Sequence, residues 1–470
     1  MLFLNLNIPF ISEFTIPPNL VTLTALLVLI LIPLLCSHLF TSKPSQTVFL
    51  VDFACYKPPD SQKYSRDRVL NRARELGQPK SVLNMMAKVL HKAGLGDSSY
   101  VAETILSDTQ GLDISLEAAK KESQNVIFGA IDALLAKTEV KCSEIGILIV
   151  NCTVFNVAPS LCSIIVNRYK LREDICSYNL SGMGCSAGLL AIGLAKQLLR
   201  VHQNACALIV STENITCGIY SGTDPSKHLT NCLFRIGGSA ILLSNKSSHR
   251  QSSKYELTHA VQTNTEDSEG ITGVTINKDL LIAANFAIKQ HLQTLGTLIL
   301  PLSEQFLFLK NFLIRRLNQA EVKPYIPQFN KCVEHFFSHV GGKQVLDELQ
   351  KSLGFSDTQM EASRMTLHRF GNTSSSSIWN ALTYAEAKGR MKMGDKVWQI
   401  AFGSGFKCNS VIWRVLRDVL ADDEKNPWMS DVDDYPIDLD ANGSLDYLKL
   451  HGCPLQFFFF FNINSMAILE

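Results

Sequence analysis

The stretch NLSGMGCSAG, residues 179–188, places one cysteine, Cys185, in a turn built mostly of small residues. The run ICSYNL leads into this turn with the composition of a strand, and AGLLAIGLAKQLLR follows it with the spacing of a helix. Gly182 and Gly184 permit positive φ angles and a close approach of another molecule to the backbone. The stretch therefore predicts a sharp strand-to-helix turn that presents one thiol at the top of a sheet.

The expected chemistry of this turn follows from its place at the start of a helix. Free N–H groups and partial positive charge at a helix N-terminus favour thiolate over thiol. The same N–H groups can stabilise an oxyanion that forms on a carbonyl group. We therefore expect the turn to lower the pKa of Cys185 and to make it a nucleophile. A buried structural cysteine at a tight turn remains an equal alternative for this stretch alone.

Two later stretches offer partners for a reactive cysteine, which needs a proton acceptor and a hydrogen-bond donor. EHFFSHVGGKQVLD carries His335 and His339 before a glycine pair, and LHRFGNTSSSSIWNAL carries His368 and Asn372 in a predicted loop before a helix. The two histidines four residues apart raise the question of a metal pair. No third ligand stands at a natural spacing and no H-E-x-x-H occurs, so we expect no metal. For His335, a core histidine is the alternative.

Strand-like and helical patterns alternate along the chain. Short apolar runs rich in branched residues predict buried strands at residues 145–150, 206–211, 237–244, 397–403 and 409–416. Apolar residues at helical spacing predict helices after Ser115 and over residues 160–169, 187–202, 278–295, 341–353 and 375–388. This alternation predicts an α/β architecture with a largely covered sheet.

Composition shifts divide the chain into four predicted parts. These are an N-terminal anchor (1–45), a first half with the nucleophilic cysteine (46–250), a second half with the histidine and asparagine (251–421) and an irregular tail (422–470). The charged stretch SQKYSRDRVLNRARELGQPK reads as a linker within the first half. The polar stretch at residues 245–272 marks the boundary between the halves.

The N-terminal part has the character of a membrane span. No acidic or basic residue occurs between Glu13 and Lys43, and the run Leu20–Phe40 is long enough to cross a bilayer, which takes about 20 residues. A cleaved signal peptide is disfavoured, because the run exceeds an h-region of about 7–15 residues and no basic segment precedes it. Lys43 after the span favours a cytosolic main domain.

The bulk composition excludes several classes of protein. With 46% hydrophobic and 19% charged residues, the chain can bury a sizeable core. A formal net charge of +1 gives no sign of the basic stripe of a nucleic-acid binder. The 13 cysteines are scattered without a C-x-x-C pair, which indicates a reducing compartment rather than a disulfide framework or a zinc ribbon.

Taken together, these stretches resemble the plant very-long-chain 3-ketoacyl-CoA synthases, the condensing enzymes of fatty acid elongation. The resemblance runs from about Val51 to Trp428 and is carried by VDFACYKP, VNCTVFN, YNLSGMGCSAG, STENIT, FRIGGSAILLS, EHFFSHVGGK, SRMTLHRFGNTSSSSIW and WQIAFGSGFKCNS. It implies a thiolase- and chalcone synthase-like fold of two similar halves in five α-β-α-β-α layers, after an N-terminal transmembrane helix. It also implies a homodimer, anchored in the endoplasmic reticulum membrane with its catalytic domain in the cytosol.

The resemblance further implies a decarboxylative Claisen condensation of malonyl-CoA with a long-chain acyl-CoA. Its products are 3-oxoacyl-CoA, carbon dioxide and coenzyme A. The implied triad is Cys185 as the acyl carrier, with His339 and Asn372 as hydrogen-bonding partners of the malonyl thioester. The other implied site residues are the oxyanion loop Gly403, Ser404, Gly405 and Phe406 and two supporting histidines, His335 and His368. No metal or redox cofactor is needed, and other elongase-complex enzymes are expected partners.

Two departures from the family pattern leave alternatives open. Only one membrane span is clear where the family usually has two. After THAV, Asn264 stands where the family has a histidine, and the polar loop that follows is short. These departures are compatible with an alternative hypothesis, in which the chain is a thiolase-fold subunit that has lost catalysis and acts as a partner within the elongase complex. A cysteine thioesterase or acyltransferase is a third hypothesis, which predicts product formation without malonyl-CoA.

Overall fold

The structure is a computed structural model that describes residues 46–106, 111–264, 279–317, 322–323, 325–420 and 425–438. One compact unit begins at Val48, and its described residues are considered by themselves. The predicted span at Leu20–Phe40, the loop that follows Asn264 and the end of the predicted tail from residue 439 lie outside the described residues.

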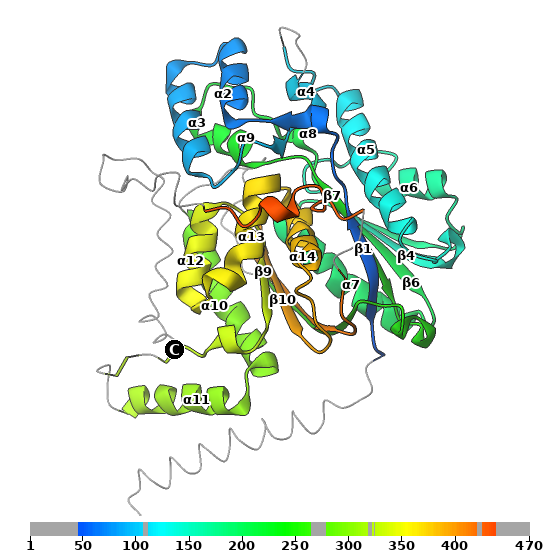
Figure 1. The fold of residues 1–470 in the computed structure, drawn as a ribbon, viewed down its shortest axis with the longest axis vertical. Helices are drawn as coiled ribbons and strands as arrows, with labels where there is room; N and C mark the ends of the chain where they lie inside the picture. The colour runs from blue at the N-terminus through cyan, green and yellow to red at the C-terminus, as the bar shows by residue number, and fades with distance from the viewer. Residues whose placement is uncertain are drawn as a thin grey trace, which may run out of the picture. The chain divides into compact units, whose positions relative to one another are not determined.

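A nine-stranded mixed sheet forms the centre of this unit (Figure 1). Its strands, in spatial order, are β5 (Cys176–Leu180), β4 (Ile145–Asn151), β6 (Cys206–Thr212), β7 (Gly238–Ser244), β1 (Phe49–Cys55), β8 (Tyr255–Asn264), β11 (Lys407–Val415), β10 (Lys396–Gly403) and β9 (His335–Ser338). Neighbours pair in parallel at β5–β4, β4–β6 and β10–β9, and antiparallel elsewhere. Only two residue pairs join β1 to β8, so the sheet divides there into a first wing (β5 to β1) and a second wing (β8 to β9).

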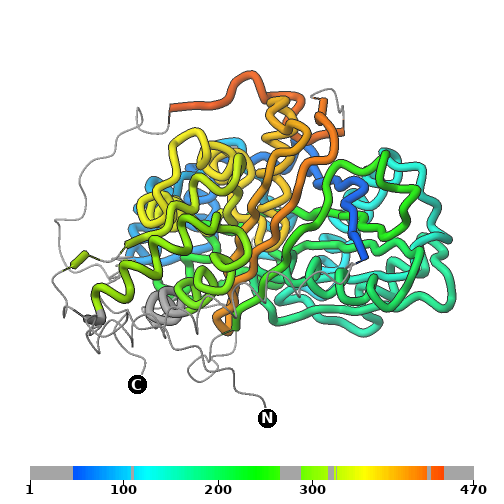
Figure 2. The backbone as a smooth tube through the Cα atoms, turned by 90° about the horizontal axis from the view of Figure 1, so that it is seen from below, coloured from blue at the N-terminus to red at the C-terminus, as the bar shows by residue number. Residues whose placement is uncertain are grey.

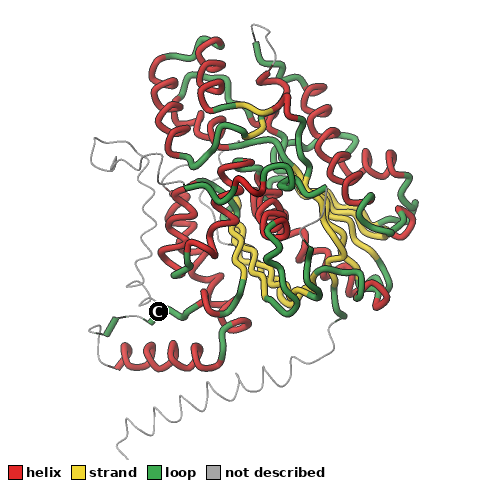
Figure 3. The backbone as a smooth tube through the Cα atoms, viewed as in Figure 1, coloured by secondary structure: helices red, strands yellow, loops and turns green. Residues whose placement is uncertain are grey.

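Helices cover both faces of the sheet (Figure 3). They are α2 (Arg66–Glu75), α3 (Lys80–Lys92), α4 (Glu103–Leu106), α5 (Leu116–Leu135), α6 (Leu161–Tyr169), α7 (Ala187–Val201), α8 (Ile215–Gly218), α9 (Leu229–Leu233), α10 (Asp279–Ile299), α11 (Leu302–Leu317), α12 (Lys343–Leu353), α13 (Asp357–Phe370) and α14 (Ser377–Ala387). Two short 3-10 turns, η3 (Gly184–Ser186) and η7 (Ser374–Ser376), precede α7 and α14.

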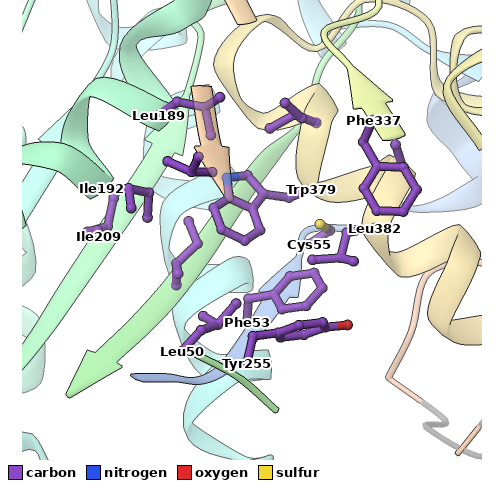
Figure 4. Close-up of a cluster of buried hydrophobic side chains, with 14 of the residues drawn as sticks. Leu50, Phe53, Cys55, Leu189, Ile192, Ile209, Tyr255, Phe337, Trp379 and Leu382 are labelled. Atoms are coloured by element: carbon purple, nitrogen blue, oxygen red, sulfur yellow. The ribbon is translucent and has the colours of Figure 1, made fainter. Parts of the chain in front are cut away.

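The helices α7 and α14 form a central layer between the two wings. α7 contacts β4 and β6 of the first wing and β8 and β11 of the second, and α14 contacts β1, β9 and β10. Every residue of α14 is buried. In the core around this layer, Trp379 packs on Phe53 with ring centroids 5.2 Å apart, beside Leu189, Ile192 and Leu382 (Figure 4).

Outer helices complete the layers on either side. α5 and α6 cover the first wing, and α10 covers β8 and β11 of the second. Successive residues of one strand pack into different hydrophobic cores, as expected for a sheet covered on both faces. In β4, Ile147 and Ile149 join the central core, whereas Leu148 and Val150 join the core under α5 and α6. In Figure 2, β10 and β11 (orange) lie between the yellow-green helices and the first wing (green and cyan).

A buried charged cluster holds the two wings to the central layer. Lys254 Nζ lies 2.9 Å from Asp52 Oδ1 of β1 and 2.9 Å from Glu386 Oε2 of α14. The hydroxyl of Tyr255, at the start of β8, donates to Glu386 Oε1 at 2.6 Å. Each charge therefore has a partner, which buried charges require. The cluster fixes the strand pair at which the wings join.

The predicted strands and helices are confirmed to within a few residues, and Ser115 and Ser160 cap α5 and α6 as Ser residues commonly do. The linker predicted at residues 61–80 is wrong, because α2 and the start of α3 occupy it. Ser65 caps α2 by accepting from Arg68 N, and Val69 and Ala73 bury one face of it. Among the described residues, one helical segment is apolar and long enough to cross a membrane, Gly184–Val201, and half of it is buried in this fold as α7.

Candidate active site

Cys185 lies in η3, between the end of β5 and the start of α7, as the glycine pattern predicts. Gly182 and Gly184 have φ angles of +67° and +66°, a region that side chains rarely adopt. A Cβ atom on Gly184 would lie 2.4 Å from the backbone N of Ser404, and one on Gly403 would lie 2.7 Å from the carbonyl oxygen of Met183. The turn with Cys185 and the predicted oxyanion loop therefore meet backbone to backbone.

The rest of that loop fits the same arrangement. Gly405 also has a positive φ, +67°, and Phe406 is buried. From β11, Asn409 Nδ2 donates to the carbonyl oxygen of Ser186 at 3.2 Å, which ties the second wing to the cysteine turn. The backbones of two segments that are distant in the chain thus lie together beside Cys185.

Ser374, in η7, is the point at which the three predicted triad residues meet. Its hydroxyl donates to Cys185 Sγ at 3.5 Å, and its backbone N donates to Asn372 Oδ1 at 2.9 Å. The imidazole of His339 hydrogen-bonds the backbone of Ser374, and its Nδ1 lies 2.8 Å from Ser377 Oγ. Ser374 adopts a φ of +55°, a strained conformation for a residue with a side chain. Such strain persists only where the surroundings hold it, which is common at active sites.

The two titrating groups of the triad are both neutral at rest. Burial raises the pKa of Cys185 to about 12; the Ser374 hydroxyl opposes this shift, and the negative charge of Glu213 adds to it. Burial lowers the pKa of His339 to about 4, so its imidazole carries no charge at neutral pH. The expectation that the turn lowers the thiol pKa is therefore wrong, because desolvation outweighs the field of the helix terminus.

Glu213 is a buried member of the site that the sequence patterns did not single out. It follows β6, and its carboxylate accepts from the backbone N of Thr153 at 3.1 Å and of Val154 at 3.0 Å. Its Oε2 also lies 3.2 Å from Ser374 Oγ. A hydroxyl has one hydrogen, so Ser374 donates either to Cys185 Sγ or to Glu213 at any moment. The available signal is a charged residue directly after CALIVST, a strand whose first five residues are apolar.

The two histidines predicted in supporting positions have other partners. His335, at the start of β9, pairs its Nε2 with Asp395 Oδ2 at 2.8 Å. His368 lies in the last turn of α13 rather than in a loop, where its Nδ1 is 3.3 Å from the hydroxyl of Tyr435 and its ring packs on Gly96. Within the described part of the chain, no group of three or more His, Cys, Asp or Glu residues is arranged to hold a metal ion.

Solved structures resemble this fold over most of its length. The C-terminal type III polyketide synthase domain of Steely1, a type I/III hybrid from Dictyostelium, matches with a TM-score of 0.62 and 15% identity, over 79% of this chain and 99% of that one. CsyB complexed with CoA-SH matches with a TM-score of 0.61 and 20% identity, over 78% of this chain and all of that one. These similarities confirm the predicted thiolase-like α/β fold.

Sequence comparisons identify nearer relatives. A family model described as FAE1/Type III polyketide synthase-like protein matches residues 40–317, and one described as 3-Oxoacyl-(acyl-carrier-protein) synthase III C terminal matches residues 330–415. 3-Ketoacyl-CoA synthase 4 of Arabidopsis thaliana is 51% identical over 83% of this chain and 78% of its own length. 3-Ketoacyl-CoA synthase 11 of the same plant is 49% identical over 85% of this chain and 81% of its own length. The chain therefore belongs to the plant 3-ketoacyl-CoA synthases, within the FAE1/type III polyketide synthase-like family.

Proposed function

We propose that this chain is a 3-ketoacyl-CoA synthase of very-long-chain fatty acid elongation that works through a thioester on Cys185. The observation that carries the proposal is the meeting of Cys185, His339 and Asn372 around Ser374, beside the glycine loop whose Ser404 lies against Gly184. The family membership supports the same reaction. The acyl donor is a long-chain acyl-CoA, and malonyl-CoA supplies the two added carbons.

In the first step the acyl chain moves to the enzyme. The sulfur of Cys185 attacks the thioester carbonyl of the acyl-CoA, and its proton passes to the neutral imidazole of His339. Because the thiol pKa is about 12, this proton transfer accompanies the attack rather than preceding it. Backbone N–H groups at Cys185 and in the loop at Ser404 hold the oxyanion. The carbon–sulfur bond to coenzyme A then breaks, and coenzyme A leaves as a thiol with the proton from His339.

In the second step malonyl-CoA loses carbon dioxide. The electrons of the broken carbon–carbon bond form an enolate, whose oxygen is held by N–H groups of His339 and Asn372. Asn372 is oriented for this task, since its Oδ1 accepts from Ser374 N and its Nδ2 remains to donate. The enolate carbon attacks the acyl-Cys185 carbonyl, and the carbon–sulfur bond breaks. The released thiolate takes a proton from water, and 3-oxoacyl-CoA leaves two carbons longer.

The setting of this reaction belongs to the same proposal. No step transfers electrons to an acceptor, so no redox cofactor or metal is required. The run Leu20–Phe40 anchors the chain in the endoplasmic reticulum membrane, with the catalytic unit in the cytosol, where it works as a homodimer beside other elongase enzymes. The apolar composition of the anchor and the names of the plant relatives support this assignment.

The test is malonyl-CoA-dependent lengthening of a series of acyl-CoAs by microsomes that contain the full-length chain. Cys185→Ala should abolish lengthening, whereas the matched change at the exposed thiol, Cys217→Ala, should preserve it. Lengthening no greater than that of Cys185→Ala would support a non-catalytic subunit. Release of product from acyl-CoA without malonyl-CoA would support a thioesterase or acyltransferase instead.

A further inference from the structure

The helix α11 turns an apolar face away from the protein. Leu302 and Phe306 are 67% and 52% exposed, and they continue into the half-buried Leu309 and Leu313. These four residues stand at i, i+4, i+7 and i+11, which places them on one side of the helix. Figure 1 and Figure 2 show α11 at the rim of the compact unit, away from the sheet.

Two polar side chains of α11, Glu304 and Asn311, face the protein instead. Glu304 Oε2 accepts from the hydroxyl of Tyr325 at 2.7 Å and from the backbone N of Gln328 at 3.0 Å. Asn311 accepts from the backbone N of Tyr325 at 2.9 Å and donates to the carbonyl oxygen of Lys323 at 3.0 Å. A surface helix of a soluble domain has the opposite arrangement, with its apolar stripe toward the core.

Three more large apolar side chains near this stripe are exposed. Leu307 and Phe312 lie on the two flanks of α11 and Leu298 lies at the end of α10, with exposures of 43%, 38% and 46%. Soluble monomers rarely leave so many large apolar side chains together in water, and such patches mark interaction sites. The exposed face of α11 therefore requires an apolar occupant.

Charge and chain length both favour a lipid surface as that occupant. On α11 the basic Lys310 is exposed, whereas the single acidic residue, Glu304, is already bonded inward. Basic side chains beside a face of Leu and Phe are typical of helices that lie in a membrane interface. The predicted span ends at Phe40 and β1 begins at Phe49, so the link between them extends no further than about 30 Å.

We propose that α11 lies in the plane of the membrane, with Leu302, Phe306, Leu309 and Leu313 inserted at the boundary of headgroups and acyl chains. The inference rests on the membrane anchoring proposed above. The span alone gives the membrane a single point of attachment to the catalytic unit. A second attachment through α11 fixes one face of that unit toward the lipid, from which a very long acyl chain has to be taken.

The experiment uses the full-length chain in microsomes and a carbene photolabel that partitions into lipid tails. Labelled peptides are then mapped by mass spectrometry. We expect adducts on Leu20–Phe40 and on Leu302 and Phe306. Met393 and Val201, which are 71% and 77% exposed but do not belong to the stripe on α11, should show only background labelling. Labelling of Leu20–Phe40 with α11 at background overturns the inference and leaves the anchoring intact. Background labelling of both overturns the two together, and labelling of α11 alone supports α11 as the membrane contact.

Paired substitutions and a crosslink separate lipid from protein as the occupant. Leu302→Ser with Phe306→Ser should abolish labelling of α11 and preserve labelling of Leu20–Phe40, since both side chains are exposed and no core packing is lost. Met393→Ser is the matched control and should change neither. An amine crosslinker at the exposed Lys310 tests the alternatives. A crosslink from Lys310 to a second copy or to another protein, with α11 unlabelled, would show that protein covers this face.

Discussion

Ser374 Oγ lies 3.5 Å from Cys185 Sγ, although 189 residues separate the two in the chain. The same hydroxyl lies 3.2 Å from Glu213 Oε2. One hydrogen is thus shared between a thiol that must ionise during the reaction and a carboxylate whose charge opposes that ionisation. The reactivity of Cys185 depends on this balance as well as on the imidazole of His339.

Ser374→Ala removes the hydrogen bond that favours the Cys185 thiolate. The thiol pKa should rise further, and acyl-enzyme formation should slow by roughly fivefold, which corresponds to the loss of about 1 kcal/mol for one hydrogen bond. The measurement is the rate of alkylation of Cys185 by iodoacetamide, followed by mass spectrometry. Ser374→Gly is the matched variant, because it lacks the hydroxyl and relieves the positive φ. Equal alkylation rates in the parent and in Ser374→Gly would show that the hydroxyl does not set the reactivity of Cys185.

Glu213→Gln removes the negative charge that raises the pKa of Cys185. We expect the pH profile of Cys185 alkylation to move to lower pH, since the thiolate then forms more easily. The control is Glu122→Gln, a second buried carboxylate that binds the backbone N of Ile215 and Thr216 and does not contact Ser374. An unchanged or more alkaline profile in Glu213→Gln would falsify the electrostatic role of this residue.

The cysteine turn could be predicted from the sequence because local rules determine it. A strand pattern, two glycines and a helical pattern specify the geometry of residues 179–188 without reference to the rest of the chain. Ser374 could not be predicted in the same way. It is one of four consecutive serines, and only the contacts of η7 with Cys185, His339 and Glu213 distinguish it from its neighbours.

Two further features, the helix α2 and the pKa of Cys185, also differ from their predictions for physical reasons. α2 is rich in charged residues, which made it resemble a linker. Its buried face consists of Val69, Arg72 and Ala73 alone, so its apolar stripe is too narrow to predict a helix. The pKa of Cys185 was predicted from the helix terminus alone. Desolvation of the half-buried Cys185 reverses the direction of the shift. This desolvation comes from η7 and other segments distant in the chain, so no local pattern predicts it.

The burial of neutral His291 predicts that the stability of the fold decreases at low pH. It is fully buried on α10, with Nδ1 2.9 Å from Thr263 Oγ1 and Nε2 2.7 Å from Ser410 Oγ, and burial lowers its pKa from 6.5 to about 4. Between these two values the unfolded chain binds a proton that the folded chain does not. Stability contributed by neutral His291 is therefore present above pH 6.5 and is lost as the pH falls toward 4. From pH 7 to pH 5 the loss is about 2 kcal/mol.

The measurement for His291 is urea unfolding of the detergent-solubilised chain at pH 7 and pH 5. His291→Gln removes the titrating group and keeps polar atoms for Thr263 and Ser410, so its loss of stability between the two pH values should be smaller than that of the parent. The exposed His91→Gln is the matched control and should retain the full loss. Equal losses in the parent and in His291→Gln would assign the pH dependence to other groups.

Gly184→Ala tests whether the two loops of the site must touch. Both Gly182 and Gly184 have positive φ angles, so an alanine at either costs about 1 kcal/mol in backbone strain. A Cβ on Gly182 meets nothing within 4 Å, whereas one on Gly184 would lie 2.4 Å from Ser404 N. Gly184→Ala should therefore lose a further 1–3 kcal/mol or so of unfolding free energy, typical of overpacking, and should displace the loop that begins at Gly403. Urea unfolding of the two variants side by side measures the difference. Equal stabilities would mean that the loop moves aside freely and that the contact between Gly184 and Ser404 does not hold the site together.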